Sequence, residues 1–257
     1  NQAPRAQAPS LPAIPSAPGV PTVADWNKPQ NAILAAGPRI KIVTPRLFGS
    51  ISISGARIDN LTLVDYRETL DPESPEIVLL IPKGAPKAYF AEFGWVAAGG
   101  QAVPGADTVW QAKRKTLAPE TPVTLTWDNG QGLRFSRTFA VDNDYMFTVT
   151  QKVKNTGTSA VTLYPYGLIS RRTTPEVIGF YILHEGLLGV TNGTLSEIDY
   201  DDLQEEGQIK ETTRGGWLGI TDKYWLTALV PDQQTEVGTR FFHRLADGDD
   251  RYQVDFL

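Results

Sequence analysis

Apolar and polar residues alternate along most of the chain with a repeat of two residues. Successive side chains of an extended strand point to opposite sides, so this pattern indicates strands that cover a core with one face. The alternating segments are Ile40 and Ile42, Ile51 and Ile53, Leu61 and Leu63, Val123 to Trp127, Leu133 to Val141, Tyr145 to Val153, Val161 and Leu163, Phe241 to Leu245, and Tyr252 to Phe256. No window of about twelve residues shows the period of a helix. We therefore predict an all-β fold with few, short helices.

The clearest turn lies between two of these segments, at Asp128-Asn129-Gly130-Gln131-Gly132. Asn-Gly readily adopts the positive φ angles that tight hairpin turns require. We therefore predict a hairpin that joins a strand around Leu125 to a strand around Phe135.

Two stretches are apolar on both sides of the alternation. One is the run from Ile77 to Ile81, which lies between two prolines. The other runs from Tyr224 to Val230 and ends at a proline, which cannot donate to a sheet. A strand that is apolar on both faces must be covered on both, so we predict that both stretches are buried strands. Trp225, and with it Trp217, is predicted to be a core residue.

The first 30 residues differ in composition from the rest of the chain. Six prolines fall between Pro4 and Pro21, among alanines and small polar residues, with few large apolar side chains to bury. Such a composition favours extended, mobile chain. We predict a tether over residues 1–30 and a single domain over residues 31–257. The only methionine is Met146 and the chain starts at Asn1, so we expect a piece of a longer product.

Several blocks of sequence carry a family resemblance. They are residues 44–51 (TPRLFGSI), 55–61 (GARIDNL), 89–95 (YFAEFGW), 181–186 (YILHEG) and 216–225 (GWLGITDKYW). In this order they resemble the large periplasmic domain of the YidC family of bacterial inner-membrane protein insertases, especially its alphaproteobacterial branch. The similarity runs from about Ile40 to Pro231.

The resemblance implies a fold, a location and partners. The fold would be a large twisted β-sandwich, a supersandwich like that of galactose mutarotases, held between two transmembrane helices on the periplasmic side of the inner membrane. The parent protein would insert and help fold inner-membrane proteins, alone or with the Sec translocon. This domain would contact the Sec accessory subunits SecF and SecD and nascent membrane proteins. Further strands and an amphipathic helix would follow Leu257, so the domain's C-terminal edge would be truncated here.

Composition narrows the class of partner. The chain has 24 basic and 29 acidic residues, a net charge of −5, which argues against binding to nucleic acid. It contains no cysteine, which excludes disulfides, thiolate zinc sites and cysteine nucleophiles. The apolar run from Ile77 to Ile81 is far shorter than the ~20 residues that span a bilayer.

Candidate catalytic residues are His184, Glu185 and His243. Sugar mutarotases of the resembling fold use a histidine and a glutamate, so a sugar-acting or sugar-binding domain is the alternative function. Neighbouring residues on a strand point to opposite faces, however, and His184 and Glu185 would not converge there. A shared fold also does not carry function. We predict that the domain is not an enzyme and assign no catalytic residue.

Acidic residues and glycines are candidate ligand sites. The acidic residues are Glu197, Asp199, Asp201, Asp202, Glu205 and Glu206, with Asp247, Asp249 and Asp250 later. They lack the spacing and the glycine of a calcium loop, so we interpret them as solvated. Gly99-Gly100 and Gly215-Gly216 match no phosphate-binding motif, and no serine lies in a nucleophile elbow. No metal or cofactor is predicted. Most aromatic side chains are expected in the core, and a peptide-binding groove at exposed sheet edges remains a further alternative.

Overall fold

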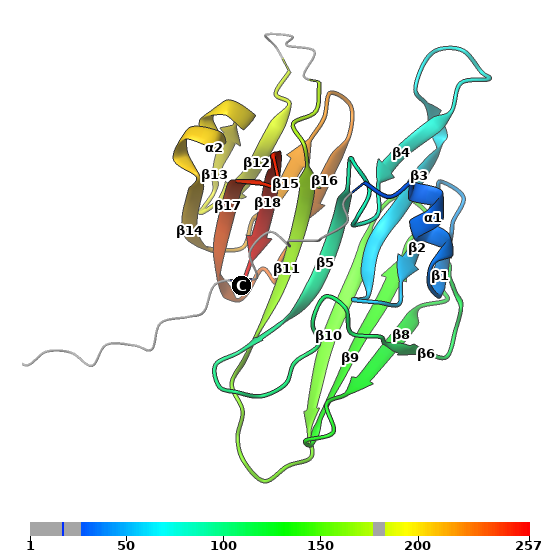
Figure 1. The fold of residues 1–257 in the computed structure, drawn as a ribbon. Coiled ribbons are helices and arrows are strands. Elements are labelled where there is room, and N and C mark those ends of the chain that lie inside the picture. Colours follow the sequence, from blue (N-terminus) through cyan, green and yellow to red (C-terminus); the bar gives the residue numbers. More distant parts are fainter. Residues whose placement is uncertain (1–16, 18–26, 177–182) are drawn as a thin grey trace, which may run out of the picture.

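The computed structural model describes residue 17, residues 27–176 and residues 183–257 (Figure 1). Strands dominate these residues, and two short helices accompany them, α1 (Gln30–Ala35) and α2 (Tyr200–Glu206). The large sheet contains β1 (Arg39–Val43), β2 (Leu47–Ser52), β3 (Arg57–Arg67), β4 (Glu76–Leu80), β5 (Tyr89–Ala97), β7 (Thr116–Leu117), β11 (Leu163–Arg172), β14 (Gln208–Arg214), β17 (Glu236–Ala246) and β18 (Asp249–Phe256). The prediction of an all-β sandwich with few helices is confirmed.

Two smaller sheets complete the fold. The first small sheet contains β6 (Gln111–Ala112), β8 (Val123–Asp128), β9 (Leu133–Val141) and β10 (Phe147–Asn155). The second small sheet contains β12 (Gly186–Thr191), β13 (Thr194–Ile198), β15 (Trp217–Thr221) and β16 (Leu226–Leu229).

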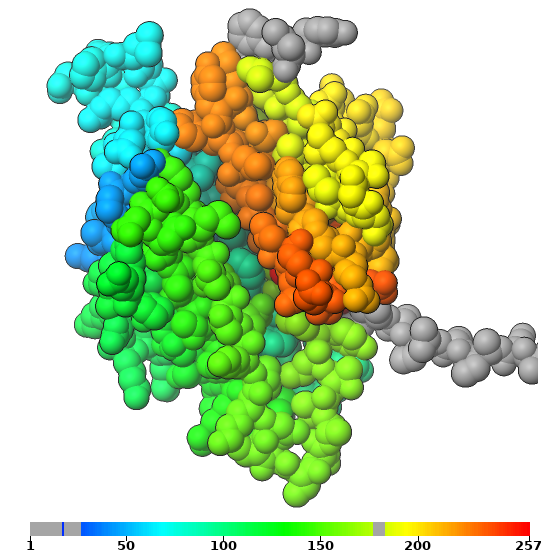
Figure 2. Space-filling view, turned by 180° about the vertical axis from the view of Figure 1, so that it is seen from behind, coloured from blue at the N-terminus to red at the C-terminus, as the bar shows by residue number. Residues whose placement is uncertain are grey.

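Both small sheets pack side by side against one face of the large sheet (Figures 1 and 2). Trp95 at one end of β5 meets Phe135 of the first small sheet, with ring centroids 5.1 Å apart. Tyr89 at the other end of β5 donates its hydroxyl to the Ile220 carbonyl of the second small sheet at 3.3 Å. Both side chains lie on the same face of β5, because they are six residues apart. One continuous apolar core therefore runs under both small sheets.

The predicted hairpin is confirmed. β8 and β9 pair antiparallel, with Asp128 opposite Arg134. The turn needs a positive φ at Gly130, which is 70°, and the Asn129 carboxamide oxygen accepts from the Gln131 amide at 2.8 Å. Along β9, inward residues such as Phe135 are buried while the residues between them are more exposed. The two-residue alternation thus sets which face of the first small sheet covers the core.

The two strands predicted to be buried on both faces are edge strands, and that prediction is wrong. β4 pairs only with β3, and Val78 on it is exposed. β16 ends the second small sheet, and Tyr224, Leu226 and Val230 are 70%, 47% and 57% exposed. Among residues 27–176 and 183–257, the second small sheet packs against one layer only, so the apolar residues on this side of β16 meet no further layer there. Trp225 is half-buried and packs edge-on against Tyr66, with centroids 4.5 Å apart.

The outer face of the large sheet, opposite the small sheets, carries buried charged groups. Glu92 on β5 accepts from the Tyr166 hydroxyl at 3.1 Å and lies 3.4 Å from the Arg57 guanidinium on β3. Farther along the sheet, Arg240 on β17 pairs with Asp255 on β18 at 2.8 Å. These groups are stabilised by one another rather than by water, since a buried charge needs a partner.

Most of the predicted tether, residues 1–16 and 18–26, lies outside the described residues, so the domain boundary at residue 30 stays a prediction. Ala17 is described, and it is buried in a small apolar cluster on the outer face. Its carbonyl accepts from Arg240 Nη2 at 3.1 Å. Composition alone does not predict this contact. Across the described ranges, no helix is long and apolar enough to cross a membrane.

Candidate functional site

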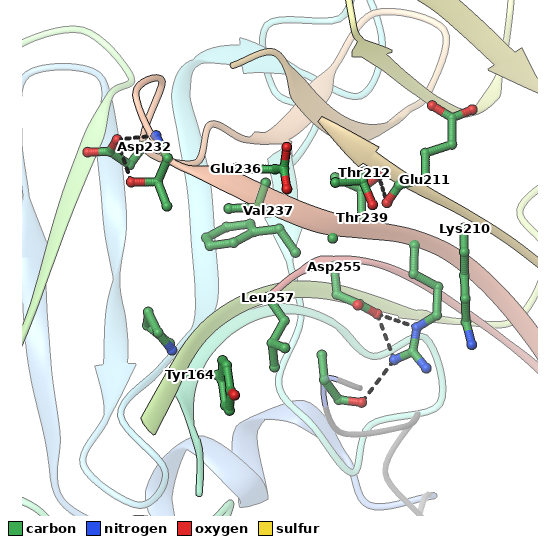
Figure 3. Close-up of a pocket in the computed structure, with 16 residues that line it drawn as sticks. Tyr164, Lys210, Glu211, Thr212, Asp232, Glu236, Val237, Thr239, Asp255 and Leu257 are labelled. Carbon is green, nitrogen blue, oxygen red and sulfur yellow. Dashed lines mark hydrogen bonds and ion pairs between the residues drawn. The ribbon is translucent and has the colours of Figure 1, made fainter. Parts of the chain in front are cut away.

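A cavity of about 760 Å³ opens on the outer face of the large sheet (Figure 3). Its walls come from β14, β17, β18 and the start of β11, with Ala17 contributed by the N-terminal segment. β14 is an edge strand of the large sheet, so the cavity lies at the sheet's end and not over its centre.

A buried ion pair forms the polar part of this cavity. Arg240 donates from Nε to Asp255 Oδ2 at 2.9 Å, and Gln253 Nε2 donates to the same oxygen at 2.7 Å. Burial raises the pKa of the Asp255 carboxyl, and the nearby Arg240 guanidinium opposes this shift. The carboxylate is therefore already engaged by two donors, which suits it to holding the wall rather than to proton transfer.

The remaining walls combine apolar side chains with threonines, acidic residues and Lys210. Val237, Phe256 and Leu257 are among the cavity's apolar lining residues, and Figure 3 shows Val237 and Leu257. Asp232 at the rim accepts from the backbone amides of Gln234 and Thr235, at 2.8 and 3.0 Å, and so caps a turn. The cavity thus offers apolar surface and engaged carboxylates, an arrangement that can bind a ligand.

His184 lies on the turn before β12. Its Nδ1 is 3.3 Å from Asp199 Oδ1, and its Nε2 lies 2.9 Å from the carbonyl oxygen of Leu187. The partner carboxylate is therefore Asp199 from the acidic run. A ring held at both nitrogens is typical of a structural histidine.

His243 has a carboxylate partner as well. Its Nε2 lies 2.9 Å from Asp250 Oδ1, across the β17–β18 hairpin, and its ring packs against Tyr252. The Tyr252 hydroxyl lies 2.6 Å from both the Thr174 hydroxyl and Gln204 Nε2. Each histidine thus meets a carboxylate, but neither lines the cavity on the outer face.

The acidic residues are spread over several elements. Asp201 and Asp202 lie in the first turn of α2, where negative charge is favourable, and Glu197 lies on the exposed side of β13. Within the described ranges, no three histidine, aspartate or glutamate side chains lie close enough to hold a metal ion.

Sequence reasoning missed a buried cation. Arg137 on β9 is almost fully buried and donates to the carbonyls of Gly55 at 3.2 Å and Ala56 at 3.0 Å, and also to that of Phe93. Its guanidinium also lies 4.9 Å from the Trp110 ring. Burial lowers the pKa of Arg137 to about 10. The sequence could have indicated this burial, because Arg137 occupies an inward position in the alternation of β9, between two phenylalanines.

Comparison with known proteins identifies relatives of this chain. The family model of the YidC periplasmic domain matches residues 39–257. "Membrane protein insertase YidC" of Bradyrhizobium diazoefficiens is 48% identical over all of this chain and 41% of its own length. The proteins of the same name from Nitrobacter hamburgensis and Methylobacterium radiotolerans are 50% and 46% identical, over 89% and 99% of this chain and 38% and 42% of theirs.

The chain thus spans about two fifths of the length of these relatives. The family match covers the three sheets described above and agrees with the sequence blocks that suggested it. The chain belongs to the YidC periplasmic domain family.

Proposed function

We propose that this chain is the periplasmic interaction and scaffold domain of a membrane protein insertase, which inserts and helps fold inner-membrane proteins alone or with the Sec translocon. The observation that carries the proposal is the family match over residues 39–257, together with relatives named membrane protein insertase. The partners are the Sec accessory subunits SecF and SecD and nascent membrane proteins. The domain lies on the periplasmic side of the inner membrane.

The proposed role is binding and not catalysis. In the cavity, the buried carboxylate of Asp255 is engaged by Arg240 and Gln253. The two histidines pair with Asp199 and Asp250, away from the cavity walls. A mutarotase-like function needs an acid and a base that converge on one sugar, and the geometry supports binding better.

The test uses the full-length membrane protein, purified with and without residues 39–257. Loss of SecD and SecF from the preparation that lacks the domain, measured by quantitative mass spectrometry, supports the proposal. Equal recovery of the Sec subunits from both preparations overturns it. A separate assay of aldose mutarotation with the isolated chain tests the enzyme alternative. Acceleration that His184→Ala or Glu185→Ala abolishes would replace the binding role with catalysis.

A further inference from the structure

The second small sheet has a largely apolar outer face that no other layer of the described residues covers. Its apolar outward positions lie on all four strands: Leu188 and Val190 on β12, Leu195 on β13, Trp217 on β15, and Leu226 and Ala228 on β16. Glu197, opposite Leu188, and Thr221, opposite Leu226, are polar residues of the same face. Leu195 is 53% exposed, and Leu226 packs across Gly219 of the neighbouring strand. Among the residues of these four strands, Glu197 is the only one with a formal charge.

The edge of this sheet at β16 is also unguarded. Within the described part of the chain, β16 pairs only with β15, so half of its backbone amides and carbonyls point away from the sheet. Its four residues, Leu-Thr-Ala-Leu, include no charge and no proline. Proteins normally protect such an edge with charged residues, proline or a very short strand, because a free apolar edge pairs with other chains.

The other sheet edges of the described residues show the expected protection. β10 exposes Lys152 and Lys154, and β14 exposes Lys210. β13, at the far edge of the same small sheet, carries Glu197, and β6 and β7 are only two residues long. β4 begins with a glutamate. Only β16 among them combines an apolar sequence with an open edge.

The free edge of β16 lies on the side of the second small sheet that faces the first small sheet (Figures 1 and 2). Figure 2 shows the segment of β15 and β16 in orange beside the green first small sheet, with the teal β5 lying deeper between them. Trp225, at the start of β16, is held by the ring of Tyr66 from β3. The start of the edge strand is thereby anchored to the large sheet.

We propose that the free edge of β16, with the apolar outer face beside it, binds an extended apolar segment of a client polypeptide by strand addition. This inference rests on the proposed function, because it names the client that such a domain would hold. Backbone hydrogen bonds to β16 would bind any sequence, and alternate side chains of the client would cover Leu226, Ala228 and Val230. The chain carries a net charge of −5, so basic residues that flank the apolar segment would add favourable long-range charge attraction.

A second copy of this chain fits the edge less well. A strand of four residues is about 13 Å long, so pairing of two β16 edges alone would bury far less than the roughly 1,200 Å² of a stable dimer. Each copy also carries a net charge of −5, which opposes self-association. A short edge suits a weak and reversible contact with a client.

The test measures binding of a fluorescent synthetic peptide with alternating valine and threonine and lysines at both ends. We expect saturable binding, read as fluorescence anisotropy, and slower hydrogen exchange of the amides from Leu226 to Leu229. Ala228→Lys puts a charge on the exposed side of β16 and should weaken binding about tenfold, as a charged edge residue opposes pairing. Leu195→Lys is the matched control, since it adds the same charge to the same face at the distant edge strand, and it should change binding less than about twofold.

Absence of saturable binding to the unmodified chain overturns the inference, as do equal losses in the two variants. If sedimentation shows a dimer that Ala228→Lys converts to a monomer, the edge joins copies of this chain and the client is excluded. Should Ala228→Lys fail to fold by circular dichroism, Val230→Lys makes the same test at another exposed position. Loss of Sec subunits on domain deletion, without any peptide binding, would refute this inference alone and leave the proposed function standing.

Discussion

The two small sheets pack against the same face of the large sheet, but the surfaces that they expose to solvent differ in polarity. The exposed side of the first small sheet is polar, with Thr124 and Thr126 on β8 and Lys152 and Lys154 on β10. The exposed side of the second small sheet is apolar, with Leu195, Leu226 and Val230 among its residues. A sheet needs one apolar face to cover a core. The second apolar face therefore covers no further layer among the described residues, and large apolar patches typically mark binding surfaces.

The inward faces of the two small sheets should be equally necessary for the stability of the fold. Phe139 in the first small sheet and Ile220 in the second are both fully buried. Phe139→Ala should lower the free energy of unfolding by about 3–5 kcal/mol and Ile220→Ala by about 2–5 kcal/mol, because each leaves a cavity. Urea denaturation measures both. If either variant unfolds at the midpoint of the unmodified chain, that sheet does not share the core.

A buried cation distinguishes the first small sheet from the second. Arg137→Met keeps most of the side-chain volume but removes the donors to the carbonyls of Gly55, Ala56 and Phe93. Unsatisfied buried acceptors should lower the free energy of unfolding by about 1–3 kcal/mol, although loss of the buried charge offsets part of this. Lys152→Met, at an exposed position of the neighbouring strand β10, is the control for urea denaturation. An Arg137→Met variant as stable as the control would show that the carbonyls find other donors.

Trp225 tests how firmly the open edge of the second small sheet is held. Because this side chain is half-buried, Trp225→Ala should cost about 1–3 kcal/mol, less than the ~3–5 kcal/mol of a fully buried tryptophan. The edge-on contact with Tyr66 should appear as a coupling of about 0.5–1.5 kcal/mol in a double-mutant cycle with Tyr66→Ala. Purely additive effects would mean that the two rings do not stabilise the edge.

Local pattern was sufficient to predict the hairpin of β8 and β9 in the first small sheet. The alternation from Val123 to Val141 identifies both strands, and Asn129-Gly130 identifies the turn between them. The same reasoning failed at β16. Apolar residues on both faces of a strand do not reveal whether a layer covers each face. That depends on strand order, which places β16 at an edge through pairing with β15 alone.

The candidate site could not be predicted for a similar reason. The cavity joins Ala17, Tyr164, Lys210 and Leu257, which lie far apart in the sequence. The ion pair of Arg240 and Asp255 depends on the register of β17 with β18, in which these residues are opposite each other. Sequence singled out the two histidines instead, and the structure brings each to an aspartate outside the cavity walls.

Polar replacements on the outer faces of the two small sheets should have small effects on stability. Their effects on the binding of a hydrophobic dye should differ. Leu195→Thr and Val230→Thr in the second small sheet should each change the free energy of unfolding by at most about 0.5 kcal/mol, because both side chains are exposed. Together they should reduce the fluorescence of a hydrophobic dye bound to the folded chain. Thr126→Ser in the first small sheet should leave dye fluorescence unchanged. Unchanged fluorescence in the double variant would show that the apolar face is not the accessible surface.

The smallest expected effect concerns two exposed turn aspartates, one beside each contrasted region. The Gly130 amide and Arg134 lower the pKa of Asp128 below 3.8, and the amide of Gln234 and the Thr235 hydroxyl lower that of Asp232. A lowered folded pKa contributes stability that is present above 3.8 and is lost as pH falls through the folded value. The thermal midpoints of Asp128→Asn and Asp232→Asn should therefore lie slightly below that of the unmodified chain at neutral pH and converge with it in acid.

Salt should change the thermal midpoint differences of the two aspartate variants to different extents. Asp128 pairs with the Arg134 guanidinium at 2.7 Å, and an exposed ion pair is screened by salt. Asp232 accepts from backbone amides and a hydroxyl, which carry no net charge. The midpoint difference for Asp128→Asn should therefore shrink in concentrated sodium chloride, while the difference for Asp232→Asn should persist. An equal response of both variants would mean that the Arg134 charge does not stabilise the hairpin turn, and that the two turns are held by the same hydrogen-bonding chemistry.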